Sequence, residues 1–164
     1  MDQAADHTFD APIDAVWAMF TDEASHVAKF ASMDHRDIEV LSCTRTDDSF
    51  TIEIQRVVDV ELPGIAKKVM QPTNTVVSID RWKANGDGTY SGTFELDTKG
   101  APVEIRGTTH LKPAGDKTDY RITFELKVNV PLVGGKIANW AKGDAQKQIE
   151  MEFAAGDRWL AEHA

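Results

Sequence analysis

The spacing of apolar residues along the chain changes several times, and each change predicts a new element. A weak alternation over residues 3–10 predicts a short strand that ends before Pro12. Pro12 suits the first turn of a helix of about ten residues, because its fixed φ fits a helix and its missing N–H is not needed there. A second short helix is expected over 23–31, with Thr21 or Asp22 as its cap. Its expected apolar side is formed by Ala24, Val27, Ala28 and Phe30.

From residue 36 onward apolar residues recur at every second position, which is typical of strands. Turn residues such as Asp47-Asp48, Asn85-Gly86-Asp87-Gly88 and Lys99-Gly100 separate the alternating segments and predict hairpins between them. Residues 61–73 contain two prolines and a glycine and predict a connector with one helical turn. The expected strands cover 36–46, 50–60, 75–84, 90–96, 103–111 and 120–130.

After Pro131 the spacing returns to three and four residues over about 30 positions, which predicts one long C-terminal helix. Its apolar stripe comprises Ile137, Ala141, Ala145, Ile149, Phe153, Gly156 and Leu160. Trp140, Met151 and Trp159 fall outside the stripe, so a second face of this helix is expected to contact another surface.

Composition narrows the function classes. The chain has 164 residues, 41% of them apolar and 27% charged, which predicts a single globular domain over residues 1–164. A formal charge of -9 argues against binding to nucleic acid or to an anionic membrane surface. We expect a cytoplasmic protein, because there is no signal-peptide pattern, no apolar stretch long enough to span a membrane and a single cysteine.

The order of the predicted elements, together with FDAPIDAVW over residues 9–17 and VPLVGGKI over 130–137, resembles the START and birch-pollen-allergen-like superfamily, also called SRPBCC. The second motif is similar to an uncharacterised branch common in actinobacteria. The resemblance implies an α+β helix-grip fold, in which a curved antiparallel sheet of about seven strands wraps around the long C-terminal helix. It also implies a hydrophobic-ligand cavity. Members serve as carriers, cyclases, hydrolases or co-chaperones and share no universal catalytic motif.

One departure from the superfamily limits what can be transferred. Plant members carry a glycine-rich loop between the second and third strands, whereas this chain has Asp47-Asp48-Ser49 at that turn. A function that depends on the glycine-rich loop is therefore not implied here.

The strand phases and the helix stripe place a set of side chains between the sheet and the helix, where they form either a packed core or the lining of a cavity. We expect the cavity. Arg56 interrupts an apolar face and must be paired or meet a ligand, with Asp80 or Glu95 as candidate partners. Phe50 and Leu126 share the concave face. The residues expected to bind the ligand are Ile52, Ile54, Arg56, Phe94, Leu96, Ile105, Thr109, Tyr120, Ile122, Phe124, Ile149 and Phe153.

Other chemistries find little support in the sequence. The five histidines show no metal-ligand spacing, His110 falls on the outward phase of its strand, and no serine lies in a nucleophile elbow. Cys43 is expected to pack as a small apolar residue. Gly134-Gly135 lacks the Lys-Ser/Thr of a phosphate loop and is interpreted as the start of a helix. We therefore expect no metal, no cofactor and no catalytic residue.

The favoured hypothesis is a carrier or sensor of a small hydrophobic molecule, such as a lipid, polyketide-like or sterol-like compound, rather than an enzyme. One alternative is a polyketide cyclase or aromatase, which needs an acid or base inside the cavity. Another is a co-chaperone-like interaction module that exposes Trp140, Met151 and Trp159. The chain is expected to be a monomer or a homodimer.

Overall fold

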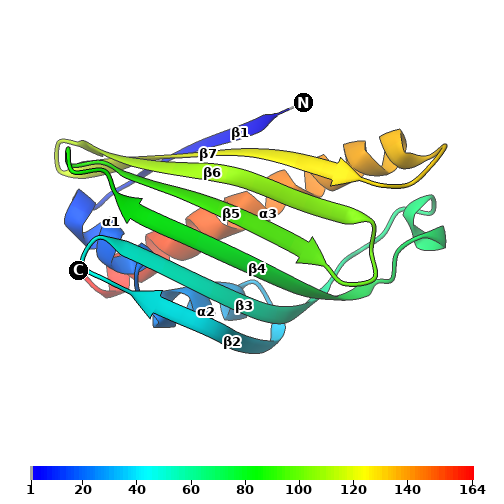
Figure 1. The fold of residues 1–164 in the computed structure, drawn as a ribbon, viewed down its shortest axis with the longest axis horizontal. Coiled ribbons are helices and arrows are strands. Elements are labelled where there is room, and N and C mark those ends of the chain that lie inside the picture. Colours follow the sequence, from blue (N-terminus) through cyan, green and yellow to red (C-terminus); the bar gives the residue numbers. More distant parts are fainter. Residues whose placement is uncertain (1) are drawn as a thin grey trace.

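The computed structural model describes residues 2–164 and contains a seven-stranded sheet and three α-helices (Figure 1). The elements in chain order are β1 (Gln3–Phe9), α1 (Ile13–Phe20), α2 (Glu23–Ser32), β2 (Arg36–Arg45), β3 (Ser49–Asp59), a 3₁₀ turn (Ala66–Lys68), β4 (Thr73–Ala84), β5 (Tyr90–Thr98), β6 (Val103–Ala114), β7 (Lys117–Val128) and α3 (Gly134–Glu162). Every predicted element is present, and the boundaries differ by a few residues. The connector over 61–73 contains the expected helical turn, and α3 begins at Gly134.

The sheet is antiparallel throughout, with strand order β1-β7-β6-β5-β4-β3-β2. Consecutive strands from β2 to β7 pair with their neighbours, and β1 joins the outer edge of β7. The long helix α3 runs along one face of this sheet, and α1 and α2 lie on the same side (Figure 1). The α+β helix-grip fold is thereby confirmed.

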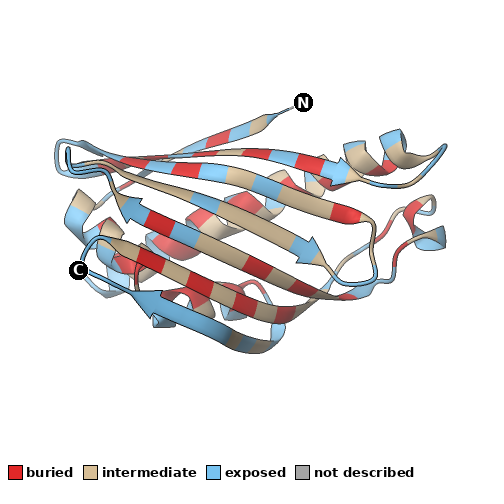
Figure 2. Cartoon of the chain, viewed as in Figure 1, coloured by how far each residue is buried: buried red, intermediate tan, exposed pale blue. Residues whose placement is uncertain are grey.

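Burial follows the periods seen in the sequence. In β3 the buried residues alternate as Phe50, Ile52, Ile54 and Arg56, and β4 and β7 show the same alternation (Figure 2). Every residue of the predicted apolar stripe on α3 is buried against the sheet or the other helices. The sheet and α3 therefore meet through the two faces that the spacing predicted.

Two expectations about α2 had different outcomes. Asp22 caps the helix, because its side chain accepts a 2.9 Å hydrogen bond from the backbone N–H of Ala24. The predicted apolar side was right for Phe30, which is buried, but wrong for Ala24 and Ala28, which are exposed. The other residues that α2 buries are Ser25 and His26. This rotation of the helix places a histidine in the interior.

Cys43 also departs from expectation, because it is exposed instead of packed. It lies on β2, which forms one edge of the sheet and has no buried residue. The contacts of α2 leave this position uncovered, although Ile38 and Val40 on the same strand are partly buried against the core.

The aromatic and Met side chains outside the α3 stripe do not form an exposed patch. Trp140, Met151 and Trp159 are all partly buried and pack against the core. Trp159 stacks on His163 with a ring-centroid distance of 3.8 Å. The interaction-module hypothesis loses the surface on which it depended.

Candidate functional site

Two adjoining chambers lie between the sheet and α3, with volumes of about 120 Å³ and about 160 Å³. The predicted cavity is therefore confirmed. An apolar cavity of about 150 Å³ accepts a molecule the size of benzene, so each chamber has room for one ring or a short chain. The side chains that line both chambers are Phe30, Arg56, Phe94, Leu96, Ile149 and Glu152.

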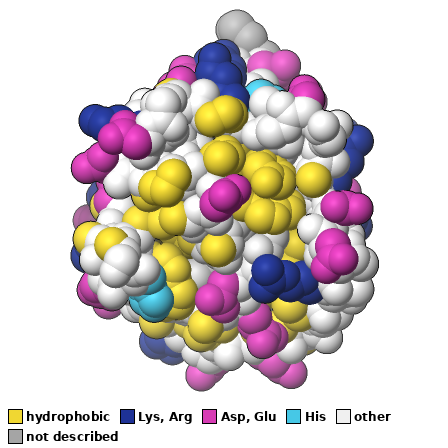
Figure 3. Space-filling view, turned by 90° about the vertical axis from the view of Figure 1, so that its left-hand side faces the viewer, with side chains coloured by type: hydrophobic (Ala, Val, Ile, Leu, Met, Phe, Trp, Pro, Cys, Tyr) yellow, Lys and Arg dark blue, Asp and Glu magenta, His cyan; other side chains and the backbone are white. Residues whose placement is uncertain are grey.

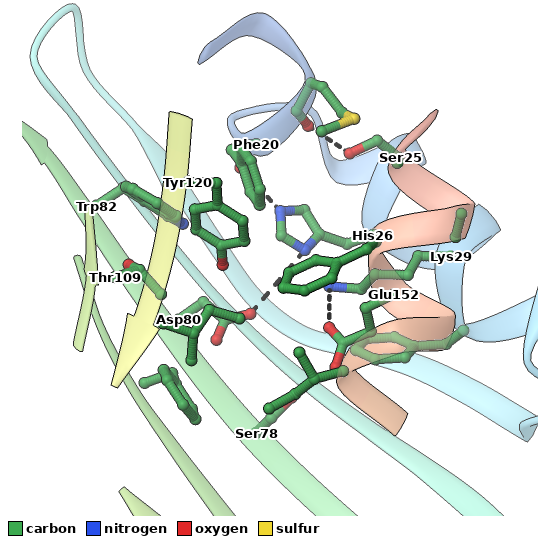
Figure 4. A pocket seen from close by; sticks show the side chains of 18 of the residues that line it. Phe20, Ser25, His26, Lys29, Ser78, Asp80, Trp82, Thr109, Tyr120 and Glu152 are labelled. Atoms are coloured by element: carbon green, nitrogen blue, oxygen red, sulfur yellow. Dashed lines mark hydrogen bonds and ion pairs between the residues drawn. The ribbon is translucent and has the colours of Figure 1, made fainter. Parts of the chain in front are cut away.

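Chamber one is the aromatic chamber, at the end of the molecule that carries α1 and α2. Its apolar walls include Phe20, Trp82, Tyr120 and Phe153, whose rings contact one another in tilted and edge-on arrangements. Figure 4 shows polar side chains from α2, β4, β7 and α3 pointing into this space. The chamber thus combines an apolar wall with a compact polar cluster.

Chamber two is lined largely by aliphatic side chains and lies beneath the first half of α3. Val58 and Val76 line it from the sheet, and Trp140, Ala141 and Ala145 line it from the helix. Trp140 therefore faces the interior cavity.

Arg56 stands at the junction of the two chambers and is only 4% exposed. Its Nη1 donates a 2.7 Å hydrogen bond to the Ser78 hydroxyl, and its Nε donates one of 3.1 Å to His35 Nδ1. Its guanidinium also lies over the Phe30 ring, 3.7 Å from the ring centroid. The inward position was predicted correctly.

The predicted acidic partner of Arg56 was wrong. Among residues 2–164, no carboxylate lies within ion-pair distance of its guanidinium. Glu95 instead forms ion pairs with Arg81 and Arg106 at the exposed face of the sheet, because the β5 phase turns it outward. Burial lowers the pKa of Arg56 to about 10, so the side chain is still a cation at neutral pH.

His26 is the most enclosed polar residue of chamber one, with 3% exposure. Its Nε2 lies 2.8 Å from the carbonyl oxygen of Phe20. A carbonyl only accepts, so Nε2 carries the proton and Nδ1 presents a lone pair. Burial, reinforced by the charge of Lys29, lowers the pKa of His26 to about 3 and keeps the ring neutral.

Nδ1 of His26 has no hydrogen-bond partner within the described part of the chain. The nearest acidic atom is Oδ2 of Asp80 at 4.0 Å, too far for a hydrogen bond. Burial raises the pKa of Asp80, although 21% of its side chain is still exposed, within the chamber that it lines. Burial also raises the pKa of Tyr120 well above its usual range, so this hydroxyl keeps its proton.

A salt bridge forms the opposite wall of the polar cluster. Lys29 Nζ lies 3.1 Å from Glu152 Oε1 and joins α2 to α3 (Figure 4). Because each charge has its partner, the pair contributes little net charge to the chamber. Arg56 is then a cation of the site without a direct ion pair, and Glu152 and Asp80 favour its charge from a longer distance.

Residues 4–160 match the family model described as Protein of unknown function (DUF2505). The chain belongs to this family. No curated protein matches the sequence at a significant level.

Solved structures similar to this DUF2505 chain share its START-like helix-grip fold. TTHA0849 from Thermus thermophilus aligns at a TM-score of 0.69 and 14% identity over 100% of this chain and 99% of its own. The Zhui aromatase/cyclase from Streptomyces sp. R1128 aligns at 0.65 and 14% over 98% and 94%. The human StarD13 lipid transfer and protein localization domain aligns at 0.59 and 15% over 97% and 76%. At such identities the likeness concerns the fold alone.

Ten of the twelve predicted ligand-binding residues of the DUF2505 chain line the cavity. Arg56, Phe94, Leu96 and Ile149 line both chambers, Thr109, Tyr120, Ile122 and Phe153 line chamber one, and Ile105 and Phe124 line chamber two. Ile52 and Ile54 lie outside both chambers. They are buried on β3, where α2 packs close by, as the stacking of His26 on Phe50 shows.

The sequence interpretation missed His26, Lys29, Ser78 and Glu152 as residues of this site. The available signal was the spacing of His26 and Phe30, which places a histidine on the same side of a helix as a buried aromatic residue. The phase of β4 also places Ser78 and Asp80 on the same face.

A third hollow of the DUF2505 chain lies on the surface, between α1 and the last turns of α3. Figure 3 shows apolar side chains gathered at that end of the molecule, interspersed with charged ones. No helix among residues 2–164 is both long enough and apolar enough to cross a membrane.

Proposed function

We propose that this protein binds a small hydrophobic molecule in the two chambers between the sheet and α3, as a carrier or sensor. The observation that carries the proposal is the pair of adjoining chambers with mainly apolar walls in an otherwise well-buried core. Burial of apolar ligand surface supplies roughly 25 cal/mol per Å², so a ligand that fills both chambers gains most of its affinity from contact with these walls. The cytoplasm is the compartment that we propose for this binding.

The size of the chambers limits the ligand. Each chamber accepts about one ring or a short chain, so a one-ring molecule with a short aliphatic substituent fits the unaltered cavity. Larger lipid-like ligands require α3 to move away from the sheet. This proposal is supported by the similar folds of a lipid transfer domain and an aromatase/cyclase, whose own ligands are not transferred to this chain.

Native mass spectrometry of the freshly purified protein tests the proposal, followed by calorimetric titration of the ligand-free protein with propylbenzene. We expect a co-purified small molecule or saturable propylbenzene binding. Ala145→Phe places a ring in chamber two and is expected to abolish binding, whereas Ala154→Phe, on the exposed side of the same helix, leaves it unchanged. Circular dichroism checks that both variants fold. The absence of any adduct and of propylbenzene binding in the native protein overturns the proposal.

A cyclase or aromatase is the second candidate, favoured by the neutral His26 and the buried Asp80 inside chamber one. Groups with displaced pKa values in a cavity are typical of general acids and bases. Conversion of an added poly-β-keto thioester, lost in His26→Phe, supports this activity, and unchanged substrate with the native protein removes it.

A further inference from the structure

Three polar groups converge in chamber one without a protein partner for each. His26 Nδ1 is unpaired and fully enclosed, and Asp80 Oδ2 lies 4.0 Å away. The hydroxyl of Tyr120 points toward the same space in Figure 4, and no hydrogen bond of this hydroxyl is seen within residues 2–164. A buried polar group without a partner destabilises the fold, so an unmatched group aimed into a cavity indicates a ligand atom or a water molecule.

The geometry fits a single oxygen atom. Two hydrogen bonds of about 2.8 Å span the 4.0 Å between His26 Nδ1 and Asp80 Oδ2 with an angle near 90° at the shared oxygen. An sp³ oxygen placed there reaches His26 Nδ1 only after a neighbouring side chain shifts, because this atom has less than 1 Å² of exposed surface. The two side chains come from α2 and β4, so the spacing is set by the packing of the helix on the sheet.

The chemistry of the three groups selects among oxygen-containing ligands. His26 Nδ1 only accepts, because Nε2 carries the proton that bonds to Phe20. An ether or ketone oxygen cannot donate to it. A carboxylate cannot donate either and would be close to the Asp80 carboxyl group. An ammonium group would lie near Lys29 and Arg56. A neutral hydroxyl donates one hydrogen bond to His26 Nδ1 and accepts another from the Tyr120 hydroxyl, or from Asp80 when that carboxyl group carries its proton.

We propose that chamber one is a hydroxyl-specific subsite for an alcohol or phenol on an otherwise apolar body, with the ligand O–H donating to His26 Nδ1 and its oxygen accepting from the Tyr120 hydroxyl, or from Asp80 in its protonated form. This rests on the proposed function and adds the ligand class to it. The apolar body contacts Phe20, Trp82 and Phe153 and extends past Arg56 into chamber two.

The test compares 4-propylphenol with 4-propyltoluene by calorimetric titration of the ligand-free protein. The two probes have nearly the same shape, and the methyl compound is the more hydrophobic. A purely apolar chamber therefore binds 4-propyltoluene more tightly. The subsite is expected to reverse this order and to favour 4-propylphenol by about tenfold, the affinity effect of a good buried hydrogen bond.

Two variants locate the preference. His26→Phe keeps a ring of similar size and removes the acceptor, so 4-propyltoluene is expected to become the tighter ligand. Tyr120→Phe removes one hydroxyl only and is expected to reduce the preference several-fold, and it serves as the deciding variant where His26→Phe does not fold. His110→Phe and Tyr90→Phe change the same residue types outside both chambers and keep the wild-type preference.

The outcomes separate the two proposals. Tighter binding of 4-propyltoluene than of 4-propylphenol by the native protein means that water alone occupies the subsite, which overturns this inference and leaves the proposed function intact. A preference for 4-propylphenol that survives in both variants also overturns the inference, because the hydroxyl then binds elsewhere. Failure of both probes to bind overturns the inference together with the proposed function.

Discussion

The guanidinium carbon of Arg56 lies 3.7 Å from the centroid of the Phe30 ring, so this buried cation packs on an aromatic face. Its two hydrogen bonds are to the neutral hydroxyl of Ser78 and to the ring of His35. Burial and the charge of Arg56 lower the pKa of His35 to about 4, so this ring is also uncharged at neutral pH. The buried positive charge of Arg56 therefore has only uncharged hydrogen-bond partners. A buried ion pair would behave differently when one partner is removed.

Arg56→Met tests this description. The variant loses the contact with Phe30 and two hydrogen bonds, but it also removes a charge whose burial is unfavourable. We expect a loss of about 1–2 kcal/mol in the free energy of unfolding, measured with urea. Arg81→Met, which changes the exposed Arg81 on the neighbouring strand β4, is the matched control and is expected to cost less than about 1 kcal/mol. A loss of about 3–5 kcal/mol for Arg56→Met would instead indicate a buried carboxylate whose negative charge is compensated by Arg56.

The fold could be predicted from the sequence because each element has one buried face with a regular period. The alternation from Phe50 to Arg56 and the stripe from Ile137 to Leu160 are both reproduced in the structure. These patterns record which side chains leave water, and that requirement is nearly independent of the neighbouring element.

The partners of the polar residues could not be predicted in the same way. Arg56 reaches Ser78 and His35, which are 22 and 21 positions away, and a long side chain chooses among such partners only when the strands are in register. His26 was missed because its hydrogen bond to the Phe20 carbonyl depends on the angle between α1 and α2. Periodicity carries no information about that angle.

The grip of α3 on the sheet predicts a large effect at Phe153. This side chain is 3% exposed, and its ring stacks on His7 at a centroid distance of 4.7 Å. Phe153→Ala is expected to cost about 3–5 kcal/mol of unfolding free energy, because the lost transfer energy and the new cavity add. Trp159→Ala, at a half-buried position near the end of the same helix, is expected to cost much less.

Chemical denaturation of both variants at several protein concentrations checks this expectation. Equal losses with a midpoint that rises with concentration indicate that Trp159 is buried against a second copy of the chain. Equal losses at a constant midpoint contradict the assignment of the gripping face.

Gly107 predicts a close approach that excludes any side chain. A Cβ atom built there would lie 2.4 Å from the Thr123 carbonyl oxygen and 2.5 Å from the Phe94 ring, which lines both chambers. Gly107→Ala is therefore expected to destabilise the protein by about 1–3 kcal/mol and to push Phe94 toward the cavity. Gly143→Ala lies at an exposed helical position, where an added Cβ meets no atom within 4 Å apart from its chain neighbours and its own helix backbone. This change is expected to stabilise the protein by about 0.5–1 kcal/mol. Thermal unfolding of the two variants shows whether each substitution raises or lowers the stability of the protein. A stabilising Gly107→Ala would show that the strands separate easily at this point.

The buried His26 predicts how stability depends on pH. Its pKa is 6.5 in the unfolded chain and about 3 in the folded protein, where burial disfavours the charged ring. Between these values the unfolded state binds a proton that the folded state does not bind. The folded protein therefore loses about 1.4 kcal/mol of stability for each unit that the pH falls below 6.5, until the pH approaches 3.

Other groups contribute to the same profile, so the prediction concerns a difference between variants. His35 acts in the same direction as His26, since its pKa is also lowered, whereas Asp80 acts in the opposite direction, because burial raises its pKa and the folded state takes up the proton first. Urea unfolding at several pH values from about 6.5 to about 4.5 is expected to show a shallower decline in His26→Phe than in the native protein. The expected difference in slope is about 1.4 kcal/mol per pH unit. Phe20→Leu changes a neighbour of His26 that does not titrate, so it is expected to lower stability at every pH and to keep the native slope. If His26→Phe declines as steeply as the native protein, His26 is protonated in the folded state and Nδ1 is not a free acceptor in chamber one.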